Sequence, residues 1–208
     1  VGVAGRQICC DVELGDRGER QLRRVGDQGA VIRTIEHANF LDEPTAALMV
    51  ERGAIMVPTL VAYEATMKYG RQQGYPERNF KKNETVLAVG TKSLEVARAG
   101  GVKMAFGTDL IGELDGFQCD EFEIRSRVLS NAEIIRSATL VGAEVVRREG
   151  EMGVIAEGAF ADALILDEDP LEDISVLARG GDGLRAIIKE GVFYKDELGL
   201  SGELGVAA

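Results

Sequence analysis

The sequence predicts an α/β fold in which parallel strands alternate with helices, followed by a small β module. Short apolar segments alternate with stretches whose apolar residues recur at helical spacing. The connections between the apolar segments are too long for hairpins, which is the pattern of parallel βαβ units. After Gly150 the chain changes to short apolar runs separated by Gly, Asp and Pro, which is typical of β structure. Strands are expected at 30–35, 54–57 and 102–106, and helices at 42–52 and 77–99.

The first two predicted helices carry start and stop signals. Asp42 is followed by Glu43 and Pro44, and the first turn of a helix favours both an acidic residue and a proline. Gly53 follows this helix, and a Gly-Gly pair at 100–101 follows the second. Glycine adopts the left-handed conformation that ends helices, so both boundaries are expected near these residues.

The middle of the chain is expected to contain a polar loop and a long amphipathic helix. The loop follows the strand at 54–57 and includes Tyr63 and Tyr75. The helix at 77–99 has apolar residues along one face, as expected when one side packs on a core. The expected core contacts of this helix are Val86, Val89, Leu94 and Ala97.

The C-terminal third is expected to begin with helices and end in β structure. Ser130 and Glu133 have the spacing of a capping box, and the helix that follows is expected to break near Gly142. Further on, a tight turn at 189–191 is expected to join two antiparallel strands. The expected strands of this region are 163–166, 186–188 and 192–194.

Composition and charge exclude several classes of function. Of the 208 residues, 45% are hydrophobic and 28% are charged, which is the balance of a globular protein with a substantial core. The formal net charge of −11 would repel a polyanion, so no nucleic-acid partner is expected. No apolar run approaches the roughly 20 residues that span a bilayer, so no membrane partner is expected. Three cysteines, two of them adjacent, do not make a disulfide framework, and the expected location is the reducing cytoplasm.

Two polar residues stand at the ends of predicted strands. His37 ends the first of these strands and Asp109 follows the third. Residues at the carboxyl ends of parallel strands point into one shared mouth, where active sites are built. An imidazole nitrogen and a carboxylate oxygen are both good zinc ligands, and Asp109 could instead be a general base. The alternatives are a histidine on the surface or hydrogen-bonded in the core, and a Thr-Asp helix cap.

Four segments follow one another in a recognisable order. Residues 33–38 contain His37, residues 53–60 read Gly-Ala-Ile-Met-Val-Pro-Thr-Leu, and residues 105–109 end in Gly-Thr-Asp. The fourth segment, 153–163, is followed by an acidic turn at 167–171. In order and spacing these segments resemble the sixth, seventh and eighth strands and the β-sandwich return of the metal-dependent amidohydrolase superfamily. The group of imidazolonepropionases and Xaa-Pro dipeptidases is the most similar, over about residues 31–196.

The resemblance implies a fold, a chemistry and a set of roles. The expected fold is the second half of a (β/α)8 TIM-type barrel over residues 1–150 and part of a small β-sandwich over 151–208. The expected reaction is metal-dependent hydrolysis of a C–N bond in a small amide, dipeptide or cyclic amide. His37 would be the sixth-strand ligand of a divalent metal, most often zinc. Asp109 would be the eighth-strand ligand and would also take the proton from the attacking water.

The chain departs from the family pattern in its ligand set. The family uses a His-x-His pair, a Lys or Glu and a further His, whereas this sequence has one histidine. At the expected end of strand five stands either Asp11, which can ligate a metal, or Arg17, which cannot. In the loop after the eighth strand, the group tends to carry a His before a Gln and an acidic-Phe pair, and here that His is missing: Gly116, Phe117 and Gln118 precede the acidic-Phe segment at 120–122. We therefore expect weak metal binding and little or no activity in the isolated chain.

The departures leave alternatives to an enzyme. One is a non-catalytic remnant or interaction subunit that pairs through open sheet edges, by self-association. Another is a complementing half whose N-terminal half is a separate chain, and the start at Val1 rather than Met indicates a missing N-terminal portion. Tyr63 and Tyr75 either line a substrate mouth or lie in a surface loop. Cys119 is close enough to that mouth to be considered as a nucleophile, but no second histidine exists to activate it.

Overall fold

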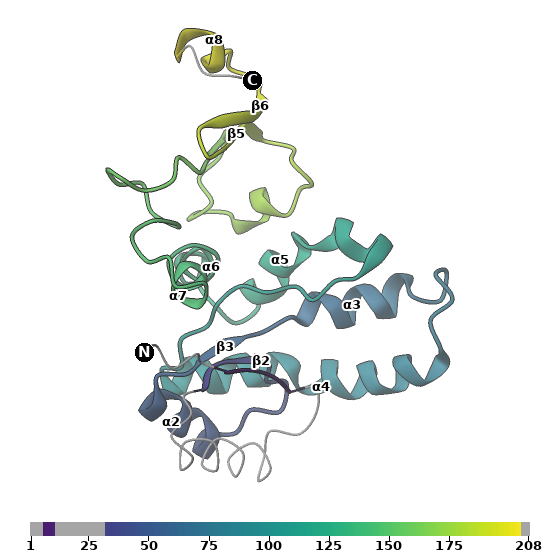
Figure 1. Cartoon of the computed structure of the whole chain (residues 1–208). Coiled ribbons are helices and arrows are strands. Elements are labelled where there is room, and N and C mark those ends of the chain that lie inside the picture. The colour runs from purple at the N-terminus through teal and green to yellow at the C-terminus, as the bar shows by residue number, and fades with distance from the viewer. Residues whose placement is uncertain (1–5, 11–31, 205–208) are drawn as a thin grey trace.

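A parallel three-stranded sheet forms the centre of the N-terminal part of the protein. The computed structural model describes residues 6–10 and 32–204. Strand β1 (Arg6–Cys10) pairs in parallel with β2 (Ile32–His37), which pairs in parallel with β3 (Ile55–Val57), as Figure 1 shows. The predicted parallel α/β arrangement is confirmed for these strands.

The predicted boundaries of the first helix are confirmed. Helix α2 (Glu43–Arg52) begins after Asp42, whose side chain accepts a hydrogen bond from the Thr45 backbone N–H. It ends at Gly53, which has a φ of 65°. A residue with a side chain rarely adopts that conformation, so the glycine sets the end of the helix.

The predicted long polar loop after β3 was wrong for residues 60–69, which are helical and include Tyr63, whereas residues 70–76, with Tyr75, do connect two helices. Helix α3 (Leu60–Tyr69) buries Leu60, Val61, Tyr63 and Ala65. It lies along α4 (Glu77–Gly100), and Gly90 permits the close approach of the two helices. A Cβ atom at Gly90 would lie 2.5 Å from Leu60 Cδ2. Packing against α4 therefore decides the structure of this segment, where the local sequence signals were weak.

Helix α4 confirms the predicted long helix, and three of its four predicted core residues are buried. Val86, Leu94 and Ala97 are each at most 1% exposed, whereas Val89 is only partly buried. Leu94 and Ala97 join residues of β2, α2 and α3 in one core cluster. Among the described residues, no helix is long and apolar enough to cross a membrane.

The predicted strand at 102–106 is reduced to a single bridge. Met104 bridges Met56 of β3 in parallel, and Ala105 N donates to Met56 O at 2.8 Å. One residue further on, Phe106 N donates at 3.1 Å to the backbone oxygen of Ser137. Ser137 lies in helix α6 (Asn131–Ala138). The chain thus leaves the sheet early because its next backbone N–H has a helix partner.

Short helices follow this bridge. They are the 3-10 helix η1 (Gly112–Phe117), α5 (Asp120–Ser126), α6, and α7 (Leu140–Val145). The capping box at Ser130 and Glu133 is confirmed at the start of α6. The break between α6 and α7 falls at Thr139, not near Gly142, because Thr139 has non-helical φ and ψ of −117° and −87°.

The predicted C-terminal β strands are confirmed as an antiparallel sheet. Strand β4 (Ala163–Leu166) pairs with β5 (Leu184–Lys189), and β5 pairs with β6 (Val192–Asp196). The 3-10 helix η2 (Ile174–Leu177) lies between β4 and β5 in sequence, and α8 (Leu200–Leu204) follows β6. In Figure 1 this sheet lies beyond α6 and α7, away from the parallel sheet.

Candidate functional site

His37 is buried at the carboxyl end of β2, in a fixed orientation. Its side chain is 4% exposed, and its Nδ1 atom lies 2.6 Å from the hydroxyl oxygen of Thr59, just after β3. The Tyr63 ring contacts it edge-on, with 6.5 Å between ring centroids. A hydrogen bond on one ring nitrogen sets the direction of the other, so Nε2 is aimed by Thr59.

Asp109 lies opposite this imidazole. Its Oδ2 atom is 3.9 Å from His37 Nε2, beyond direct hydrogen-bond distance, and its side chain is 57% exposed. The structure thus brings together the two predicted site residues. Asp109 comes from the segment after the Met104 bridge, so the parallel arrangement of that segment with β3 is what places it.

The His37 and Asp109 donor atoms fit a shared divalent cation. Bonds from zinc to a histidine nitrogen or a carboxylate oxygen are about 2.0–2.2 Å, so one ion can reach two atoms 3.9 Å apart. A catalytic zinc usually has three protein ligands. Within residues 6–10 and 32–204, no group of three or more His, Cys, Asp and Glu side chains is placed to hold a metal. These residues therefore fit as two ligands of a larger set.

The backbone at this site is held in an unfavourable conformation. His37, Ala38 and Asp109 have φ angles of 64°, 49° and 51°, in the left-handed region that side chains disfavour. The described part of the chain contains only two other such residues that are not glycine, Arg147 and Glu190. Backbone strain of this kind tends to gather at functional sites.

Buried polar residues hold the loop after His37. Asn39 is 3% exposed, and its Nδ2 donates to the Tyr63 hydroxyl at 2.8 Å. The Ser93 hydroxyl of α4 donates to the Asn39 carbonyl and accepts from Leu41 N at 3.3 Å. This network connects the His37 loop to both α3 and α4, so the site is built on packed helices.

A pocket of about 320 Å³ opens beside Asp109. Tyr63 and Tyr75 both line it, so the structure places both tyrosines at a mouth next to the candidate site. Lys82 brings a cation to its wall. The other lining residues are Ala62, Thr66, Asn79, Asn83, Leu110, Ile111 and Leu114.

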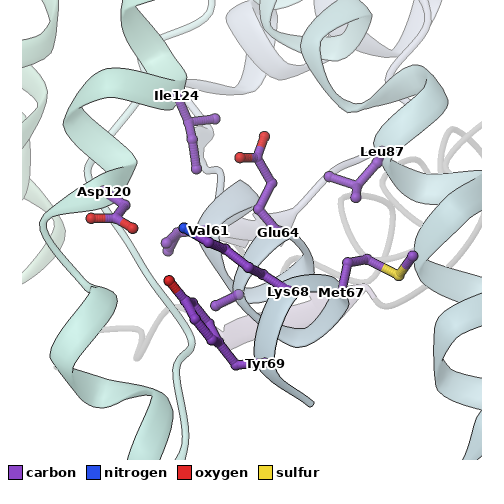
Figure 2. Close-up of a pocket in the computed structure, with 9 residues that line it drawn as sticks. Val61, Glu64, Met67, Lys68, Tyr69, Leu87, Asp120 and Ile124 are labelled. Atoms are coloured by element: carbon purple, nitrogen blue, oxygen red, sulfur yellow. The ribbon is translucent and has the colours of Figure 1, made fainter. Parts of the chain in front are cut away.

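A second pocket, of about 360 Å³, lies on a different face of α3. Figure 2 shows Lys68 and Tyr69 of α3 extending toward Asp120 of α5. Neither His37 nor Asp109 lines it, and all its lining residues come from helices. Its larger volume therefore does not make it the better candidate for the chemistry.

The remaining predicted residues have simpler outcomes. Cys119 is half-buried, and burial together with the nearby Asp120 carboxylate raises the pKa of its thiol, which disfavours the reactive thiolate. Phe117 stacks on Tyr69 with ring centroids 4.1 Å apart. Asp11 and Arg17, the candidates for the strand-five position, lie outside the described residues.

Three residues at or near the site are not among the predicted site residues. Thr59 stands in the motif at 53–60, but nothing in that motif indicates a contact with His37, which is 22 residues away. Glu121 and Arg125 form an ion pair in which both side chains are 0% exposed. Their spacing of four on a helix is a signal for a pair, though not for its burial.

Comparison with known sequences points to one family. The profile of the amidohydrolase family matches residues 27–193. Ochratoxinase of Aspergillus niger is 28% identical over 146 residues, which are 69% of this chain and 30% of that enzyme.

Solved structures give the same indication. A prolidase complexed with N-methylphosphonate-L-proline is 47% identical, with a TM-score of 0.80, over 86% of this chain and 43% of the prolidase. A Xaa-Pro dipeptidase with methionine bound in its active site is 30% identical, with a TM-score of 0.75, over 91% and 44% of the two chains. The chain thus spans less than half the length of these relatives.

Proposed function

The chain belongs to the amidohydrolase family, and from that premise we propose that it carries part of the active site of a metal-dependent hydrolase. The enzyme would cleave the C–N bond of a small amide, a dipeptide or a cyclic amide. The observation that carries the proposal is the approach of His37 Nε2 to Asp109 Oδ2 at 3.9 Å, at the end of a parallel sheet. The ion would be zinc, since imidazole and carboxylate both suit it.

The roles of the two residues follow from their surroundings. When bound, a divalent ion supplies a Lewis acid that lowers the pKa of water to about 7 and polarises a carbonyl. His37, buried and held by Thr59, serves as a fixed ligand. The half-exposed Asp109 accepts the proton that the attacking water loses and returns it to the leaving nitrogen. A C–O bond forms and the C–N bond breaks, so the products are an acid and an amine.

The pocket beside Asp109 is the proposed substrate site. Lys82, Asn79 and Tyr75 offer a cation and hydrogen-bonding groups at its wall, which suits a substrate with a free carboxylate. Related enzymes support this choice, since one solved relative is a prolidase with a proline-derived ligand. Another is a Xaa-Pro dipeptidase with bound methionine. A dipeptide or an N-acyl amino acid fits both observations.

The proposed architecture is half of an enzyme. Residues 1–150 would form the second half of a (β/α)8 barrel and 151–208 part of a β-sandwich, with the remaining ligands in an N-terminal half. The support is that solved relatives are matched over 43–44% of their lengths. With two ligands alone, the chain would bind metal weakly and catalyse little. The expected location is the cytoplasm, and the expected partner is a small molecule, not nucleic acid or membrane.

A second candidate function is an interaction chain without activity of its own. The described residues supply two of the usual three or more ligands. Strand β1 also pairs on one side only among the described strands, which leaves a sheet edge able to pair with another chain. The partner would be a second copy of this chain or an N-terminal half.

Zinc titration of the full chain tests the proposal. Competition with a chromophoric chelator should show one zinc site. His37→Ala and Asp109→Asn should each lower the zinc affinity at least about tenfold, because even the loss of a residue that only orients a ligand has an effect of that size. Asp182→Asn, an exposed carboxylate outside the site, is the matched control and should leave the affinity unchanged. If both site variants bind zinc as the control does, the two residues are not ligands. A chain that takes up no zinc has no metal site of its own.

A further inference from the structure

A buried ion pair within α5 also forms hydrogen bonds to the segments that carry the candidate site. Arg125 Nε donates to Glu121 Oε1 at 2.8 Å, and both side chains are 0% exposed. Burying two charges costs about as much as their attraction returns, so such a pair is weak evidence for stability alone.

Arg125 connects the ends of two neighbouring segments of the sheet. Its guanidinium donates to Pro58 O at 2.7 Å and to Ala105 O at 2.9 Å. Pro58 directly precedes Thr59, and Ala105 lies four residues before Asp109. Because the guanidinium is a rigid planar fork, these bonds fix the separation of the two carbonyls.

The two segments touch just beyond this connection. A Cβ atom at Gly107 would lie 2.6 Å from Val57 Cγ1 and 3.3 Å from Thr59 Cγ2. The absence of a side chain at Gly107 thus lets the Asp109 segment pass against Thr59. A small change in the separation of the segments would alter the position of Asp109 relative to the residue that holds His37.

Glu121 replaces the missing cap of helix α3. Thr59 is the N-cap residue of α3 but makes no capping hydrogen bond, and its hydroxyl contacts His37 Nδ1. The first backbone N–H groups of a helix need acceptors from elsewhere. Glu121 Oε2, from α5, accepts from Val61 N in that first turn at 2.7 Å. The carboxylate of another helix therefore does what the threonine would ordinarily do.

We propose that Glu121 and Arg125 are positioning residues of the His37–Asp109 site. Glu121 caps α3 and so leaves the Thr59 hydroxyl to hold the His37 ring. Arg125 holds Glu121 in place and sets the separation of the Thr59 and Asp109 segments. The importance of this for catalysis rests on the proposed function, whereas the effect on His37 does not.

The test uses the fact that the chain has a single histidine. The full chain, labelled with 15N-histidine and prepared without a histidine tag or metal, gives one set of imidazole NMR signals. Thr59→Val, which removes the contact with Nδ1, defines the signals of an unheld ring. Glu121→Leu and Arg125→Met should move the imidazole signals toward those of Thr59→Val. Glu121→Gln keeps an acceptor for Val61 N and should leave the signals near those of the unsubstituted chain.

Two controls separate positioning from general loss of stability. Arg127→Met removes the exposed ion pair with Glu64 at the end of the same helix and should not move the signals. Leu94→Ala opens a cavity in the main core, and its lower melting temperature should leave the ring signals in place. If Glu121→Leu and Arg125→Met leave the imidazole signals where Leu94→Ala leaves them, the proposal is wrong. If one of these two variants does not fold, the other decides. If the imidazole signals move as expected in Glu121→Leu and Arg125→Met but the chain binds no zinc, the positioning role is upheld and the proposed metal site is refuted.

Discussion

The hydroxyl of Thr59 lies 2.6 Å from His37 Nδ1 instead of capping the helix that Thr59 begins. The hydroxyl thus contacts the imidazole and no backbone N–H of the helix. The consequence is a ring whose Nε2 is directed at Asp109, 3.9 Å away. Residues that orient a ligand in this way commonly matter almost as much as the ligand itself.

Replacing Thr59 should therefore weaken zinc binding without unfolding the protein. Thr59→Val keeps the shape of the side chain but removes the hydroxyl, and loss of a group that orients a ligand costs about 10–100-fold in metal affinity. Stability should fall by about 1 kcal/mol, the net worth of one hydrogen bond. Chelator competition measures the first quantity and urea unfolding the second. Thr59→Ser restores the hydroxyl and should recover most of the affinity, and failure of that recovery would argue against an orienting role.

A side chain at Gly107 should disturb the fold and the site together. In Gly107→Ala the new methyl group would lie 2.6 Å from Val57 Cγ1, so the Asp109 segment must move away from β3. Overpacking of this kind costs about 1–3 kcal/mol in the free energy of unfolding. Urea unfolding measures it, with Gly116→Ala as the control, since a Cβ atom there meets nothing within 4 Å. Equal stability of the two variants would show that the close approach is not required.

The sequence located the candidate site better than it located the elements around it. His37 and Asp109 were selected because each stands at a strand end, and parallel strands bring their ends to one edge of a sheet. Local signals also placed the helix boundaries at Asp42 and Gly53, which depend on neighbours within one turn. Such features are decided by residues close in sequence, so a single sequence contains the information.

The missed features depend on residues far apart in sequence. Helix α3 lacks a side-chain cap of its own and receives one from Glu121, which is 60 residues away from Val61. The strand at 102–106 is shortened because Phe106 N finds Ser137 O, 31 residues further on, as a partner. Neither contact leaves a local pattern, since the residue types involved are common on helices. A single sequence could not have predicted them without the fold.

Substitution of Lys82 should affect substrate binding in a protein that contains this sequence together with its remaining ligands. Lys82 lines the pocket beside Asp109, and loss of a charge-assisted hydrogen bond at an exposed site should raise KM for a dipeptide about tenfold. The value of kcat should change less, because the contact is made in the ground state as well. Lys82→Met is compared with Lys81→Met, an exposed neighbour on α4 that does not line the pocket. Equal KM values would place substrate elsewhere.

The buried Glu121 carboxyl should make stability fall as pH rises toward neutrality. Burial raises the pKa of this group from 4.5 to about 7, against the opposing effect of Arg125 and of the Val61 N–H, and Glu64 adds to the rise. An acid with a higher pKa in the folded than in the unfolded state binds more protons when folded. Its stabilising contribution is therefore complete below pH 4.5 and is lost as pH rises through about 7.

The measurement is the free energy of unfolding in urea at intervals from about pH 5 to pH 8, where one such group contributes a slope of at most about 1.4 kcal/mol per pH unit. Glu121→Gln removes the titrating group, so the advantage of the unsubstituted chain over this variant should shrink as pH rises. Glu123→Gln, an exposed carboxyl on the same helix, should run parallel to the unsubstituted chain. If Glu121→Gln also runs parallel, the carboxylate is ionised throughout this range, and Arg125 stabilises its charge enough to outweigh the cost of burial.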